Sequence, residues 1–137
     1  MYLVFGDKVL DSVEILENIN QNTYFKVEKD LTKATKREDV LAYKVSIDVE
    51  KLNEVLKENF DLSQIDEEEL FDEYMTLCDE LTLDLIDFVD SKGRILSRSY
   101  KWDTYDDTVK CVVAFSSIEL SELKLFDVIK RLLTQID

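Results

Sequence analysis

Acidic residues crowd into one quarter of this 137-residue chain, and the chemistry open to them is the binding of cations or of basic surfaces. Between Glu58 and Ser91 there are thirteen Asp or Glu residues and no Lys or Arg, against totals of 31 acids and 17 bases and a net charge of −14. The rest of the chain is therefore close to neutral. Because scattered charge would serve solubility equally well, we build the functional interpretation on this acidic segment.

Apolar residues recur at helical spacing inside the segment and predict an amphipathic helix with Ser63 or Asp66 as its N-cap. The acids then project from the opposite face, where neighbours at i, i+3 and i+4 repel by a few tenths of a kcal/mol per pair. We expect a basic partner or bound cations to relieve this repulsion; the alternative is a face that is merely solvated. The predicted apolar stripe is Leu70, Phe71, Tyr74, Leu77, Cys78 and Leu81. The candidate partner-binding residues, called the predicted ridge below, are Asp66, Glu67, Glu68, Glu69, Asp72, Glu73, Asp79 and Glu80.

Neighbouring carboxylates on such a ridge lie about 5–6 Å apart, which is comparable with the phosphate spacing along one nucleic-acid strand. A rigid acidic ridge can therefore imitate a nucleic-acid backbone. It steers the protein toward a groove rich in Lys and Arg, with an affinity that falls as salt rises. The same field repels DNA and RNA, so we expect no direct binding of nucleic acid.

A second candidate surface is aromatic and lies near Tyr100, among Arg94, Arg98 and Lys101. Tyr, Trp and Arg dominate the energetics of protein interfaces. The alternative is that Tyr100 and Trp102 pack in the core beside Leu96, which strand alternation allows. The secondary partner-binding candidates are Trp102, Asp103, Tyr105, Asp106 and Asp107.

Other site chemistries find little support, and we predict no enzyme, no cofactor and no metal site. The chain has no His, which excludes Ser-His and Cys-His nucleophiles and His-ligated metals. Cys78 and Cys111 lack the spacing of a metal or redox motif and are expected to be buried. An EF-hand loop centred on Gly93 lacks most of its oxygen ligands. The Glu-x-Lys spacing of Glu122 and Lys124 falls on a predicted helix rather than on a strand.

Composition predicts one folded domain spanning residues 1–137. Hydrophobic residues make up 45% of the chain, with two Gly and no Pro, which argues against disorder despite the charge. No apolar run has the length of a signal peptide core or a membrane span, so we expect a cytoplasmic protein without a membrane partner.

Periodicity predicts an α+β fold, an antiparallel sheet with amphipathic helices packed on it. Two segments stay open: residues 8–20 fit either the second strand of a hairpin or a helix, and residues 82–90 fit a strand, which we favour, or a continuation of the acidic helix. A turn with Gly93 in the left-handed conformation would then lead into a three-stranded meander. Ser116, with Glu119 three residues on, has the spacing of a capping box for the last helix. The other predicted strands are residues 1–5, 23–29, 41–49, 94–102 and 108–115, and a further helix follows Asp48.

In size, acidity and lack of catalytic residues, the chain resembles the small acidic inhibitors that phages use against restriction or CRISPR nucleases. It also resembles the acidic immunity proteins that neutralise basic nuclease toxins. The resemblance implies a non-enzymatic inhibitor that fills the basic groove of a nucleic-acid-binding protein or nuclease effector, as an anti-CRISPR protein or a nucleic-acid mimic does. The alternatives are a toxin-immunity protein, or a self-associating structural protein whose acids only serve solubility. A homodimer can form if Lys33, Lys36 and Arg37 meet the acidic face of a second copy.

Overall fold

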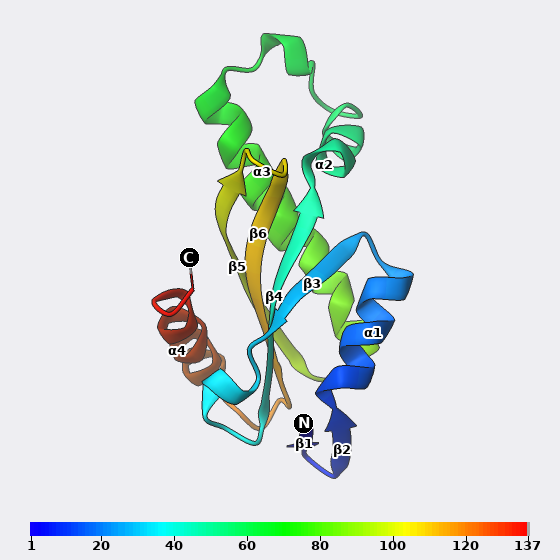
Figure 1. Cartoon of the computed structure of the whole chain (residues 1–137), viewed down its shortest axis with the longest axis vertical. Coiled ribbons are helices and arrows are strands. Elements are labelled where there is room, and N and C mark those ends of the chain that lie inside the picture. Colours follow the sequence, from blue (N-terminus) through cyan, green and yellow to red (C-terminus); the bar gives the residue numbers. More distant parts are fainter. Residues whose placement is uncertain (137) are drawn as a thin grey trace.

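The computed structural model describes residues 1–136 and confirms an α+β fold (Figure 1). A two-stranded hairpin precedes a four-stranded antiparallel sheet, and helices cover both faces of that sheet. The strands are β1 (Tyr2–Phe5), β2 (Lys8–Asp11), β3 (Phe25–Asp30), β4 (Val40–Asp48), β5 (Arg94–Asp103) and β6 (Thr108–Ser116). The helices are α1 (Ser12–Asn22), α2 (Val49–Leu56), α3 (Glu67–Thr82) and α4 (Glu122–Leu133), with short 3-10 turns η1 (Lys33–Thr35), η2 (Leu62–Gln64) and η3 (Leu83–Phe88).

The main sheet has the strand order β3-β4-β6-β5, so β4 and β6 are central and β3 and β5 form the edges. One face packs against α1, α2, α3 and the hairpin in the larger apolar cluster, which includes Tyr43 and Phe115. The other face packs against α4 in a smaller cluster around Ala42 and Ala114. Because helices cover both faces, every residue of β6 is buried, although alternation along the strand predicted only one core face.

The N-terminal segment combines the two alternatives that the sequence left open for residues 8–20. Residues Lys8–Asp11 pair with β1 as a hairpin strand, and α1 begins at the next residue. Asp11 is the point of change, because its side chain accepts a hydrogen bond from the Val13 N–H (3.1 Å) and so caps the helix. Strand β3 pairs with β4, and the predicted strands that became β5 and β6 are confirmed.

The favoured strand at residues 82–90 is wrong. The chain continues from α3 into η3, and Leu85 is the residue that this turn buries. A meander of three strands is therefore also wrong, since β5 pairs with β6 alone. Gly93 is not left-handed either: it is required because a Cβ there would lie 2.7 Å from the backbone oxygen of Ser116.

The last helix starts later than the sequence predicted. Ser116 ends β6, and the N-cap is Ser121, whose side chain accepts a hydrogen bond from the Lys124 N–H (3.2 Å). The four residues between Ser116 and Ser121 carry the chain past the end of the sheet to the face that α4 covers (Figure 1). Leu125, Ile129 and Leu132 then close the smaller cluster.

A bulge in β5 separates the two aromatic residues that alternation placed together. Ser99 pairs with Cys111 and Lys101 with Lys110, so Tyr100 is the extra residue between them. Tyr100 packs in the cluster under α4, whereas Trp102 packs in the cluster under α3.

Candidate partner-binding face

Helix α3 begins where Asp66 accepts a hydrogen bond from the Glu69 N–H (2.8 Å), which settles the N-cap in favour of Asp66. Its inner face buries Tyr74 and Cys78, as the apolar stripe predicted. Tyr74 meets the Trp102 ring edge to face at 5.0 Å, and its hydroxyl donates to Asn53 Oδ1 (2.5 Å). Phe71 is the exception in the stripe, since it is 39% exposed. The helix is thus fixed to β5, β6 and α2, so its opposite face has a defined orientation.

Carboxylates gather on that opposite face, which we call the outer acidic face. Its residues belong to the first turn and to successive positions along the helix, and all are exposed except the half-buried Glu73. Within residues 1–136, none of them forms an ion pair with a Lys or Arg. Their mutual repulsion is therefore not compensated by the described part of the chain. The outer acidic face consists of Glu68, Glu69, Asp72, Glu73 and Glu80, and Glu67 is exposed in the first turn on the side of the helix that carries Tyr74.

Asp79 belongs to the predicted ridge by spacing but turns inward. Its Oδ1 accepts two hydrogen bonds from Ser99, one from the backbone N–H and one from the hydroxyl, each 2.7 Å long. Its backbone oxygen accepts another from the Thr82 hydroxyl (2.7 Å), and the oxygen of this hydroxyl also lies 2.7 Å from Ser97 Oγ. Asp79 therefore fastens α3 to β5 at the bulge and is not available to a partner. The small serines on this face of β5 were the only sequence signal for this contact.

The secondary candidates are mostly engaged within the chain. Trp102 is packed on Tyr74, and its indole N–H donates to Asp107 Oδ1 (3.3 Å). Asp103 lies 3.9 Å from the ammonium of Lys101. Tyr105 differs from the others because it is 98% exposed at the turn between β5 and β6. This turn lies beside α3 (Figure 1), but its acids interact with residues of the chain itself.

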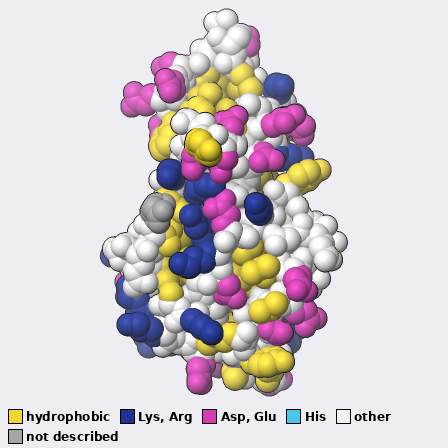
Figure 2. Space-filling model, viewed as in Figure 1, with side chains coloured by type: hydrophobic (Ala, Val, Ile, Leu, Met, Phe, Trp, Pro, Cys, Tyr) yellow, Lys and Arg dark blue, Asp and Glu magenta, His cyan; other side chains and the backbone are white. Residues whose placement is uncertain are grey.

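Asp106 belongs to an ion-pair network on the opposite face of the sheet. Lys110 is 5% exposed there, and its ammonium contacts Glu28 (2.6 Å) and Asp106 (2.8 Å), with Lys44 also 3.6 Å from Glu28. Burial lowers the pKa of Lys110, but the hydrogen bonds to Asp106 and Glu28 outweigh it and leave this pKa above its ordinary value. Figure 2 shows Lys and Arg side chains forming a stripe on this face, beside α4. On this face Lys110 and Lys44 are therefore paired with acids of the same face.

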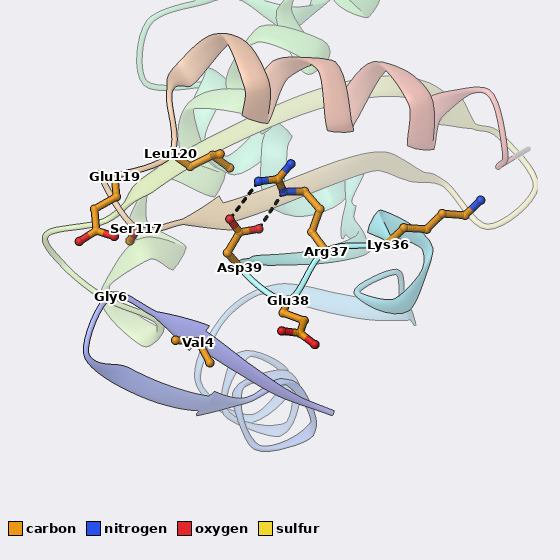
Figure 3. A pocket seen from close by; sticks show the side chains of 9 residues that line it. All are labelled: Val4, Gly6, Lys36, Arg37, Glu38, Asp39, Ser117, Glu119 and Leu120. Atoms are coloured by element: carbon orange, nitrogen blue, oxygen red, sulfur yellow. Dashed lines mark hydrogen bonds and ion pairs between the residues drawn. The ribbon is translucent and has the colours of Figure 1, made fainter.

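A hollow of about 580 Å³ lies between the N-terminal hairpin and the segment before β4 (Figure 3). Arg37 and Asp39 meet in it through two parallel contacts of 2.7 and 3.0 Å. The hydrogen bond to Arg37 lowers the pKa of Asp39, and the two charges satisfy each other. The Lys33, Lys36 and Arg37 loop of the predicted dimer lies here, at the end of the molecule away from the start of α3 (Figure 1).

Other chemistry is sparse in residues 1–136. No group of three or more Cys, Asp or Glu side chains there converges as metal ligands would. Cys78 and Cys111 are completely buried, as predicted, and burial raises the pKa of the Cys111 thiol well above its ordinary value. Within the same residues, no helix has both the length and the apolar character needed to cross a bilayer.

Comparison of the chain with protein families, with curated proteins and with solved structures found no match. The functional interpretation therefore rests on the geometry of the outer acidic face.

Proposed function

We propose that this protein is a non-enzymatic binding protein that docks the outer acidic face of α3 into the basic groove of a nucleic-acid-processing protein. The observation that supports the proposal is the absence of any ion pair to these carboxylates within residues 1–136. Elsewhere in the same residues, acids such as Glu28, Asp39 and Asp106 have basic partners. Bases are present in the chain but are not used to neutralise α3.

The shape of this face suits a groove. Helix α3 has 16 residues and is therefore about 24 Å long, and its inner side is fixed by packing. Exposed carboxylates crowd its first two turns, about 5–6 Å apart, and Glu80 lies about two turns further along the same helix. A groove that binds a nucleic-acid strand offers a complementary row of Lys and Arg, so inhibition by nucleic-acid mimicry, as in an anti-CRISPR or other anti-defence protein, is the role that we propose.

Charge reversal on matched surfaces tests the proposal. The double substitution Glu68→Lys and Asp72→Lys reverses two exposed acids of α3, and Glu14→Lys with Glu17→Lys reverses two exposed acids of α1 with the same change in net charge. Each protein is immobilised and used to capture partners from host lysate, followed by elution with duplex DNA. We expect wild type and the α1 variant to retain a basic nucleic-acid-processing protein that DNA displaces, and the α3 variant to bind it roughly tenfold more weakly.

Two results would contradict the proposal. If both double variants lose the captured protein equally, only net charge matters and α3 is not a docking face. If binding persists in about 1 M salt, where the Debye length is about 3 Å, the contact is not electrostatic.

A further inference from the structure

A second hollow, of about 390 Å³, lies at the far end of α3, where η3 meets α1, β3 and the start of α2. Its walls are mainly apolar, and three of them, Phe25, Ile47 and Leu85, are almost completely buried core residues. Leu81 and Phe88 complete this apolar lining. Apolar concave sites with a few polar groups at the rim are the usual form of a binding pocket.

The rim of this hollow continues the outer acidic face. Glu80, Asp84 and Asp87 follow one another at spacings of four and three residues, which keeps them on one side of α3 and η3. All three are exposed, and Asp84 and Asp87 line the hollow. Within residues 1–136, neither of these two forms an ion pair. A row of unpaired carboxylates therefore leads directly to an apolar opening.

The other side of the rim already holds a cation on an aromatic ring. The ammonium of Lys51 lies 3.9 Å from the centre of the Tyr24 ring, and Tyr24 is 71% exposed. The electron-rich face of this ring attracts cations in general. Acidic and aromatic groups thus surround an apolar floor, a combination that suits an apolar side chain flanked by basic residues.

We propose that the hollow receives an apolar side chain of the basic partner, presented next to Lys or Arg residues that pair with Asp84 and Asp87. This inference rests on the proposed function and adds to it the site at which the partner's apolar side chain is anchored. Exposed charges steer and orient a complex, and an apolar group buried in a pocket at the interface adds to its affinity and its specificity. The partner therefore needs an apolar residue within a basic sequence, and not positive charge alone.

Two synthetic peptides test the anchor: acetyl-Lys-Arg-Leu-Arg-Lys-amide and the same peptide with Ser in place of Leu. Both carry the same charge, so each is expected to perturb the NMR amide signals of α3. We expect the leucine peptide to bind roughly fivefold to tenfold more tightly and to shift the signals of Tyr24, Ile47 and Leu85, which the serine peptide leaves unchanged. Equal affinities, or shifts confined to α3, would refute the anchor while leaving the acidic docking face intact. If neither peptide binds, the anchor and the proposed function are both refuted.

Variants localise the effect. Tyr24→Ala removes an exposed ring at the rim, and Tyr2→Ala removes another exposed tyrosine in the N-terminal hairpin. Tyr24→Ala should reduce the preference for the leucine peptide at least threefold, and Tyr2→Ala should leave it unchanged. Asp84→Asn with Asp87→Asn should weaken the leucine peptide more than Glu14→Gln with Glu17→Gln does. If the two tyrosine variants or the two acid-neutralised variants behave alike, the apolar residue binds elsewhere.

Discussion

The strongest test of the α3 geometry is the substitution Asp79→Ala. Helical spacing places Asp79 on the same side of the helix as Glu68 and Asp72, but the structure gives it a structural role instead of a place on the outer acidic face. Its carboxylate accepts two hydrogen bonds from Ser99, each 2.7 Å long. Hydrogen bonds to a charged group contribute about 1.5–3 kcal/mol each, and partial exposure of Asp79 favours the lower end. Because the substitution also leaves the Ser99 N–H without its acceptor, we expect the free energy of unfolding to fall by about 2–4 kcal/mol.

Urea unfolding measures this loss directly. Trp102 packs against Tyr74 of α3, so its fluorescence reports when the helix separates from the sheet. Glu80→Ala is the matched control, because it removes the adjacent acid, which is exposed and has no ion pair within residues 1–136. It should change the free energy of unfolding by less than about 0.5 kcal/mol. If Asp79→Ala is as mild as Glu80→Ala, Asp79 does not fasten α3 to β5, and our division of the acids into inner and outer groups is wrong.

Two further substitutions test the frame that holds the site. Gly93→Ala should lower the free energy of urea unfolding by about 1–3 kcal/mol, because its Cβ would lie 2.7 Å from the Ser116 backbone oxygen. An unchanged free energy of unfolding would mean that the backbone around residue 93 shifts to accept the Cβ at little cost. Lys110→Met should lower the free energy of unfolding by about 1–3 kcal/mol at pH 7, since it leaves Glu28 and Asp106 without their shared cation. Burial alone would raise the pKa of Glu28, but its contacts with Lys110 leave this pKa below its ordinary value, and the pKa of Asp106 is lowered as well. The ion pairs therefore stabilise the fold fully at a pH above the ordinary pKa values of these carboxyls. This stabilisation is lost as the pH falls through their lowered pKa values. The difference between wild type and Lys110→Met should therefore shrink below about pH 4, and a difference independent of pH would show that lost packing is the cause.

Regular patterns in the sequence predicted most of the fold. Alternation identified the strands that became β3 and β4, because a half-buried strand repeats every two residues. The segment Leu83–Phe88 was predicted wrongly because residues 90–93 have the composition of a hairpin turn, which favoured a strand before it. In the structure η3 follows α3 directly, repeats every three residues and buries Leu85 alone. The continuation of the acidic helix, which the sequence left open as the alternative, is closer to the structure.

The candidate site was only partly predictable, for a related reason. Helical spacing placed Glu68 and Asp72 on an outer face, and both are exposed. The inward turn of Asp79 depends on Ser99, twenty residues later, and on a bulge that leaves no mark in composition. The hollow beside η3 depends on residues from six separate elements, so no local pattern could reveal it.

Several of the chain's basic residues lie on the two edge strands of the main sheet. Strand β3 carries Lys26 and Lys29, and β5 carries Arg94, Arg98 and Lys101. An edge strand exposes unpaired backbone groups that can pair with another copy, and positive side chains along it discourage such pairing. Two copies that approached along β5 would bring like charges together beside the apolar strand β6. Placing cations here protects the sheet against aggregation, so neutralising them should promote fibre formation before it weakens the native fold.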